Sequence, residues 1–80
     1  MEKERKIVVY TSPDCAYCYN VKGYLQEKGF EFEEIDIYED EEGYEYMKEI
    51  SGQENIPVTV IGSDIVIGWD MERLKEILSI

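Results

Sequence analysis

The architecture of the chain can be worked out from residues 7–18, which read IVVYTSPDCAYC. Residues 7–11 form a continuous β-branched and aromatic run, which is typical of a strand buried on both faces. Residues 12–14 break this pattern with serine, proline and aspartate. Apolar side chains then recur at helical spacing as far as residue 28, and Gly29 follows as a left-handed stop. The sequence therefore predicts a strand that leads into a helix.

Two cysteines, Cys15 and Cys18, stand at the junction of this strand and this helix. Unpaired backbone N–H groups and the helix dipole stabilise a thiolate at a helix start, so Cys15 is placed as a nucleophile. Cys18 follows one helical turn later on the same face, where its sulfur can reach the first and resolve a mixed disulfide. The spacing predicts thiol–disulfide exchange that needs no metal or nucleotide.

The cysteine pair allows two other interpretations. As a structural staple, a disulfide closed over so few residues removes little entropy from the unfolded chain. As half of a metal site, two thiolates leave two positions open on zinc or iron, which a second copy of the chain would complete through Cys15. A reducing compartment would not preserve a staple, and the strand-to-helix position favours redox exchange over the metal site.

The remaining sequence predicts a second strand and a second helix. The strand covers residues 33–37 and starts late, because the aromatic residues at 30 and 32 have one parity and the isoleucines at 35 and 37 the other. The acidic residues 39–42 suit the positive, N-terminal end of the helix dipole, and the helix ends before Gly52. Its apolar face comprises Tyr44, Met47 and Ile50.

The C-terminal part predicts a hairpin and a third helix. Residues 56–61 and 64–67 are β-branched runs joined through a Gly-Ser turn. Asp70 can cap a final helix, whose apolar stripe comprises Met71, Leu74, Ile77 and Leu78. The predicted order is β-α-β-α-β-β-α, an α/β fold in a single domain spanning residues 1–80, with a four-stranded mixed sheet flanked by helices.

The composition excludes several classes of function. Eight Lys and Arg against 19 Asp and Glu give a formal net charge of −11, which disfavours nucleic acid and anionic membranes as partners. With no His and two Cys, a catalytic triad and a four-ligand zinc site within one chain lack their usual residues. No apolar run is long enough to cross a bilayer and no export pattern stands at Met1, so we expect a soluble, cytoplasmic protein. We also expect it to be a monomer.

Three segments resemble the glutaredoxins and related small redoxins. Residues 10–18 are similar to the active-site segment of that family, residues 55–58 (NIPV) to the segment before its third strand, and residues 68–70 (GWD) to its closing turn. The resemblance implies a thioredoxin fold in which these segments converge, with a cis peptide bond before the proline.

The resemblance also implies an activity. It implies a thiol–disulfide oxidoreductase that reduces protein or low-molecular-weight disulfides, with Cys15 as the attacking thiol, Cys18 as the resolving thiol and Pro57 lying against them. The electron donor would be glutathione or thioredoxin reductase, and no cofactor would be bound. The alternative kept open is a dimeric glutaredoxin-like protein that binds an iron–sulfur cluster or zinc.

Substrate binding is predicted for Tyr17, Ile56, Pro57, Trp69 and Asp70. A cis bond would leave the backbone amide and carbonyl of Ile56 free to pair with an extended substrate. The resemblance implies that Tyr17 lines the substrate groove and that Asp70, besides capping a helix, meets the amino group of glutathione. Trp69 is expected to be a partly buried lid on its turn, with substrate contact as a secondary role.

Some residues depart from the family pattern. Ala16 stands where many glutaredoxins have proline, and Ser12 stands where many have a basic residue that would meet a glutathione carboxylate. A single glycine before Trp69 is closer to redoxins that serve ribonucleotide reductase and accept electrons from thioredoxin reductase. These departures leave the donor open.

Two charged residues near the cysteines complicate the prediction. The carboxylate of Asp14 disfavours a second anion on Cys15, which keeps open a non-catalytic adaptor that has lost turnover. Lys22 is interpreted as a solvated helix residue rather than a partner of the thiolate. The acidic surface would also repel the glutathione anion, although salt screens this repulsion within about 8–10 Å.

Overall fold

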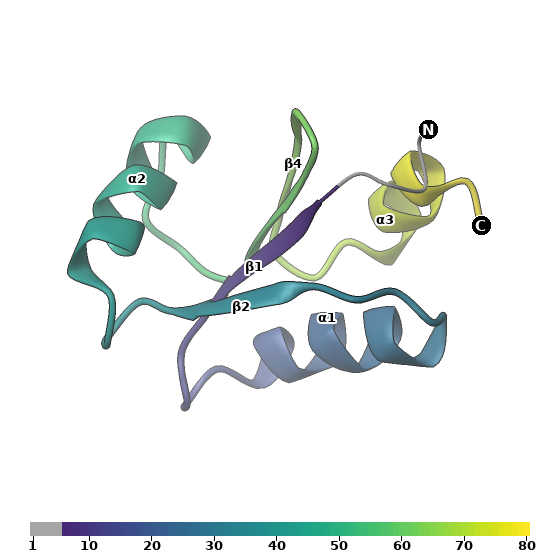
Figure 1. Ribbon diagram of the computed structural model, residues 1–80, viewed down its shortest axis with the longest axis horizontal. Coiled ribbons are helices and arrows are strands. Elements are labelled where there is room, and N and C mark those ends of the chain that lie inside the picture. Colours follow the sequence, from purple (N-terminus) through teal and green to yellow (C-terminus); the bar gives the residue numbers. More distant parts are fainter. Residues whose placement is uncertain (1–5) are drawn as a thin grey trace.

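The computed structural model describes residues 6–80 (Figure 1). Its elements follow the predicted order. They are β1 (Ile7–Thr11), α1 (Ala16–Glu27), β2 (Glu33–Asp36), α2 (Glu41–Ser51), β3 (Val58–Ile61), β4 (Asp64–Ile67) and α3 (Met71–Leu78). Residues 1–5 of the predicted domain, and with them the expectation about Met1, lie outside the described residues. None of the helices formed by residues 6–80 is long and apolar enough to cross a membrane.

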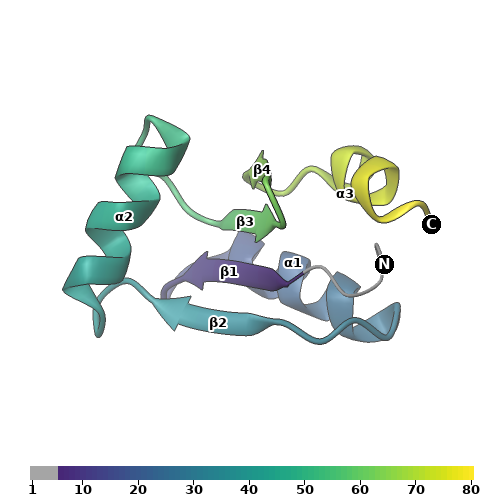
Figure 2. The ribbon, with the colours of Figure 1, turned by 45° about the horizontal axis from the view of Figure 1, so that its top comes forward.

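The four strands form one mixed sheet in the order β2-β1-β3-β4 (Figure 2). β2 pairs parallel to β1, β3 pairs antiparallel to β1, and β4 pairs antiparallel to β3. The C-terminal ends of β1, β2 and β4 therefore meet the N-terminal end of β3 at one end of the sheet. The connections that follow or precede those strand ends are brought together there.

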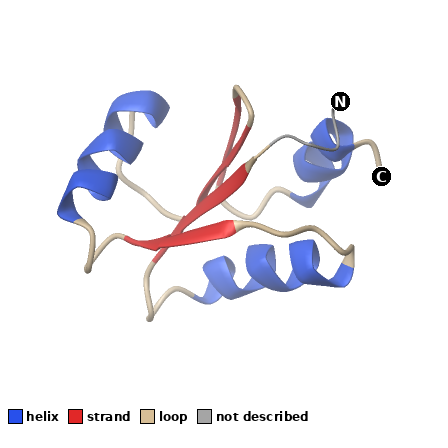
Figure 3. Ribbon diagram, in the orientation of Figure 1, coloured by secondary structure: helices blue, strands red, loops and turns tan. Residues whose placement is uncertain are grey.

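Helices cover both faces of the sheet (Figure 3). Because side chains alternate along a strand, Ile7 and Val9 join one hydrophobic cluster and Val8 and Tyr10 the other. The first cluster is built with Val21 and Leu25 of α1 and Leu74 of α3, the second with Met47 of α2. β1 is thus covered on both sides, as its continuous apolar run predicts.

The late start of β2 is confirmed. Phe30 and Phe32 pack against the cluster under α1 and α3, whereas Ile35 and Ile37 pack against the cluster under α2. The chain changes the face it buries before the strand begins at Glu33. The strand ends one residue earlier than predicted, although the Ile37 N–H still donates to the Thr11 carbonyl at 2.9 Å.

The hairpin turn is also confirmed, because Ile61 pairs with Asp64 and leaves a two-residue turn between them. The sequence predicts a third strand from residue 56, and this boundary is wrong: β3 begins at Val58. Pro57 has no N–H to give to the ladder, so regular pairing starts after it.

Aspartate side chains cap α2 and α3, and the cap at Asp70 confirms the prediction from the sequence. Asp40 accepts a hydrogen bond from the Gly43 N–H at 2.8 Å, and Asp70 accepts one from the Arg73 N–H at 3.1 Å. The stripe of α3 is shorter than predicted, because Met71 at its first position is exposed while Leu74 is buried. Met71 is the first residue of α3 and therefore lies outside the packed stripe.

Alanine should have different effects on stability at two glycines that lie inside helices. A Cβ at Gly23 in α1 would meet no atom within 4 Å, so Gly23→Ala should raise the free energy of unfolding by about 0.5–1 kcal/mol. A Cβ at Gly43 in α2 would lie 2.9 Å from Cγ2 of Ile35, so Gly43→Ala should give no gain or a loss. Urea unfolding followed by Trp69 fluorescence measures both. Equal stabilisation by the two variants would contradict the close approach at Gly43.

Candidate active site

The two cysteines lie where β1 gives way to α1. Cys15 is the residue that caps α1, and its backbone is extended, with φ of −110° and ψ of 109°. Its sulfur accepts a hydrogen bond from the Cys18 N–H at 3.2 Å. The predicted placement of Cys15 sulfur at the helix start is therefore found, and the cap position that a polar side chain often fills is occupied by a sulfur atom.

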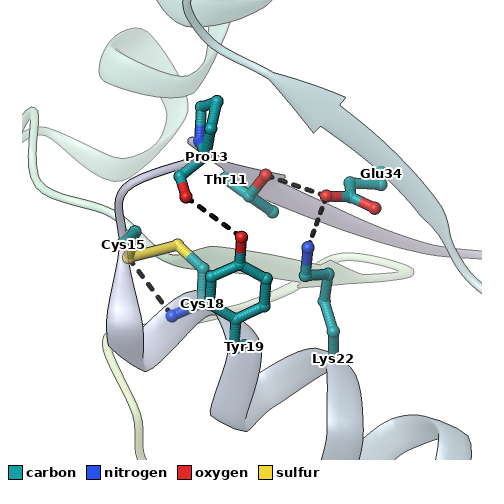
Figure 4. A network of polar contacts seen from close by, with 7 residues as sticks. All are labelled: Thr11, Pro13, Cys15, Cys18, Tyr19, Lys22 and Glu34. Carbon is teal, nitrogen blue, oxygen red and sulfur yellow. Dashed lines mark hydrogen bonds and ion pairs between the residues drawn. A yellow bond between two sulfur atoms is a disulfide. The ribbon is translucent and has the colours of Figure 1, made fainter.

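Cys15 and Cys18 are joined by a disulfide (Figure 4). Their Cα atoms are 5.3 Å apart, within the usual range for bonded cysteines. Cys15 is partly exposed, whereas Cys18 is completely buried. An incoming molecule can therefore reach the first sulfur and not the second.

The loop between β1 and α1 is held by side-chain hydrogen bonds. Ser12 is only 3% exposed, and its hydroxyl donates to Oδ1 of Asp14 at 2.7 Å. The hydroxyl of Tyr19, on the first turns of α1, donates to the Pro13 carbonyl at 3.0 Å. These bonds fix the backbone that leads to Cys15. Neither Ser12 nor Tyr19 stands in a periodic pattern, so no local signal predicts this role.

Lys22 of α1 takes part in an ion pair with β2. Its Nζ lies 2.6 Å from Oε2 of Glu34, the same oxygen that accepts a hydrogen bond from the Thr11 hydroxyl at 3.1 Å (Figure 4). Its Nζ also lies 4.6 Å from the centre of the Tyr19 ring. With a side chain only 17% exposed, Lys22 is not a solvated residue, and that interpretation is wrong. The crossover from α1 to β2 brings Glu34 to it.

The charge of Glu34 is stabilised by this contact. The hydrogen bond from Lys22 lowers the pKa of the Glu34 carboxyl below its ordinary value, and the Thr11 hydroxyl acts in the same direction, while partial burial opposes them. Thr11 is the last residue of β1, directly before the cysteine loop. The ion pair therefore joins α1 and β2 to the last residue of β1, which precedes the cysteine loop.

The other two segments of the predicted site are joined through the backbone. The Ile56–Pro57 peptide is cis, as the resemblance implies. Pro57 is buried and Ile56 half-buried, and the Pro57 carbonyl accepts a hydrogen bond from the Gly68 N–H at 2.8 Å. The turn that carries Trp69 is thus tied to the start of β3.

The remaining predicted site residues differ in their surroundings. Trp69 is half-buried and meets the Tyr24 ring edge-on, with centroids 5.8 Å apart, so its indole packs against the core on the α1 side. Asp70 caps α3, and Tyr17 is 62% exposed in the first turn of α1. All these residues lie at or near the end of the sheet where Cys15 stands. Their contact with a substrate stays a prediction.

A metal centre has no ready set of ligands within the described chain. Among residues 6–80, no three His, Cys, Asp or Glu side chains gather in an arrangement that could hold a metal ion. A cluster or zinc ion would need ligands from a second molecule.

Comparison with known proteins places this site in a family. The family model for glutaredoxin matches residues 7–66. The crystal structure of a glutaredoxin from Archaeoglobus fulgidus superposes with a TM-score of 0.84 at 30% identity, covering 94% of this chain and 87% of that one. The glutaredoxin-like NrdH-redoxin from Escherichia coli superposes with a TM-score of 0.82 at 27% identity, covering 89% and 92%.

One curated relative is named as a reductase. The N-acetyl-S-hydroxy-L-cysteine reductase of Bacillus subtilis is 43% identical over 56 residues, which are 70% of this chain and 60% of that protein. This chain therefore matches less than two thirds of the length of that relative. The activity in its name is a reduction at sulfur.

The chain belongs to the glutaredoxin family and has the thioredoxin fold. With its Cys-x-x-Cys pair at the start of α1, it is a thiol–disulfide oxidoreductase.

The ion pair of Glu34 makes a pH-dependent prediction. Because the folded-state pKa is lowered, the carboxylate contributes stability above its unfolded pKa, about 4.3, and this contribution is lost as pH falls through the folded value. Glu34→Gln should cost about 1 kcal/mol at pH 7 and less near pH 3, as measured by urea unfolding.

The matched control for Glu34 is its neighbour Glu33. Glu33 pairs with Lys6 at 3.1 Å, but both side chains are more than half exposed, so Glu33→Gln should cost less than about 0.5 kcal/mol at either pH. Equal losses from the two variants at pH 7 would contradict a structural role for the Lys22–Glu34 pair.

Proposed function

We propose that the protein reduces disulfides of proteins or small molecules through a cycle of Cys15 and Cys18. The observation that carries this proposal is the partly exposed Cys15 at the start of α1, joined by a disulfide to the buried Cys18. The helix N-terminus stabilises the Cys15 thiolate by its N–H groups and its dipole. The difference in exposure supports attack by Cys15 and resolution by Cys18.

The proposed cycle balances without any cofactor. The Cys15 thiolate attacks one sulfur of the substrate disulfide, forms a mixed disulfide and releases the first thiolate. Cys18 then loses its proton and attacks Cys15 Sγ, which releases the second substrate sulfur as a thiol. Two electrons and two protons pass to the substrate, and Cys15 and Cys18 are left as the observed disulfide.

We infer a substrate site from the surfaces next to Cys15. Half-buried Ile56 and buried Pro57 directly precede β3, at the end of the sheet where Cys15 stands, and the Ile56 backbone would pair there with an extended substrate. The exposed ring of Tyr17 would cover the substrate from the α1 side. Asp70 and Trp69 would add contacts from the turn before α3, as secondary roles to capping and packing.

The cysteine roles are tested by single substitutions. Cys18→Ser should still attack a disulfide but stop at the mixed disulfide, because no second thiol can release it. Cys15→Ser should form no adduct at a comparable rate, because its remaining thiol is buried. Mass measurement after mixing with hydroxyethyl disulfide detects the adduct.

Two outcomes would count against this assignment. Adduct formation by Cys15→Ser but not by Cys18→Ser would reverse the roles. A reduced wild-type protein in which Cys15 resists alkylation until a chelator is added would instead favour the dimer that binds an iron–sulfur cluster or zinc.

The electron donor can be identified by measuring turnover with two donor systems in parallel. The first candidate donor is glutathione, regenerated by its reductase, and the second is thioredoxin reductase. The NrdH-redoxin of Escherichia coli is described as having a thioredoxin-like activity profile. We expect faster turnover of hydroxyethyl disulfide with thioredoxin reductase, because Ser12 offers no cation to a glutathione carboxylate. Faster turnover with glutathione would contradict this expectation.

A further inference from the structure

The charged side chains are distributed unevenly between the two ends of the sheet. Four connections meet the end where Cys15 stands: residues 12–15, 37–40, 52–57 and 68–70. Together they contain five carboxylates and no lysine or arginine. The carboxylates are those of Asp14, Glu39, Asp40, Glu54 and Asp70.

The cations of the described chain lie outside these four connections. Lys6 precedes β1 and Lys28 follows α1, both at the opposite end of the sheet. The others, on the helices, are Lys22, Lys48, Arg73 and Lys75, of which all but Lys75 contact a carboxylate. Within residues 6–80, no lysine or arginine in the connections around Cys15 offsets their negative charge.

Asp14 is the carboxylate closest in sequence to the reactive sulfur, and its position is fixed. Its Oδ1 accepts the hydrogen bond of the buried Ser12 hydroxyl, while the side chain itself is exposed. Asp40 and Asp70 instead accept N–H groups of α2 and α3, whose partial positive charge offsets theirs. Asp14 accepts a hydroxyl rather than a helix N–H, and its exposed side chain directly precedes Cys15 in the chain.

We propose that Asp14 makes this site select disulfides by charge, so that those with cationic or neutral groups beside the sulfur react faster than anionic ones. This inference rests on the proposed function and names its preferred substrates. One unit charge at about 7 Å in water changes a rate by about two- to threefold at low salt, and salt removes most of the effect. A protein disulfide flanked by lysine or arginine is the matching macromolecular substrate.

The test compares three small disulfides of different charge. Reduced protein is mixed with cystamine (cationic), hydroxyethyl disulfide (neutral) or oxidised glutathione (anionic). Samples are quenched with acid at intervals and alkylated, and mass spectrometry gives the rate constant for oxidation of the cysteine pair. Each rate constant is divided by that of dithiothreitol with the same disulfide, which removes differences in leaving group. We expect the normalised rates to fall in the order cystamine, hydroxyethyl disulfide, glutathione disulfide at low salt, and to converge at about 0.5 M salt.

Asp14→Asn is the decisive variant, because asparagine keeps an oxygen that can accept the Ser12 hydrogen bond and removes only the charge. It should reduce the normalised cystamine-to-glutathione ratio by about threefold or more. A change in the amount of Cys15 thiolate affects all three substrates alike and cancels in this ratio. The matched control is Glu31→Gln, the same loss of charge in the α1–β2 connection at the opposite end, which should leave the ratio unchanged.

The outcomes separate this inference from the proposed function. Failure of neutral hydroxyethyl disulfide to oxidise the cysteine pair would refute the proposed function, and the charge preference with it. Normal reaction with that disulfide, but equal normalised rates for the charged ones, would overturn the charge preference alone. Equal shifts from Asp14→Asn and Glu31→Gln would show an effect of net charge and overturn the role of Asp14.

Discussion

The hydrogen bond from the Cys18 N–H to the Cys15 sulfur is the contact on which the site depends. The first N–H groups of a helix have no partner within the helix, and the side chain that stands before α1 can accept one of them. Here that side chain is a cysteine, and the requirement for a cap and the requirement for a reactive sulfur are met by one atom. The same helical turn carries Cys18 into the core, which sets the difference in exposure between the two sulfurs.

The position of that helix start is maintained by contacts outside it. Glu34 on β2 accepts hydrogen bonds from Lys22 of α1 and from Thr11 at the end of β1. Tyr19 reaches back from α1 to the Pro13 carbonyl. A shift of α1 along the sheet would break these contacts together. The loop of Cys15 is therefore held from the strand side and from the helix side.

Two electrostatic influences of opposite sign act on Cys15. The partial positive charge of the α1 N-terminus acts over the first turn and favours the thiolate itself. The carboxylates of the surrounding connections act over longer distances and meet any molecule that approaches. Because their ranges differ, the first influences the chemistry of the sulfur and the second influences which partner reaches it.

Local patterns in the sequence determined the order of the elements, the cap at Asp70, the two-residue hairpin turn and the position of Cys15 before a helix. Each of these depends on residues within a few positions of one another, so periodicity and turn chemistry are sufficient. The resemblance located residues 55–58 and 68–70, but no local rule gives the isomer of the Ile56–Pro57 peptide.

The tertiary structure alone decided what lies around the sulfurs. The helix pattern indicates a solvated Lys22, because Glu34, twelve residues away, leaves no signal in it. The burial of Ser12 and the packing of Trp69 on Tyr24 likewise depend on how separate elements dock. Such contacts are set by the crossover geometry and by side-chain packing across the sheet, and neither quantity is encoded in the spacing of residues along one element.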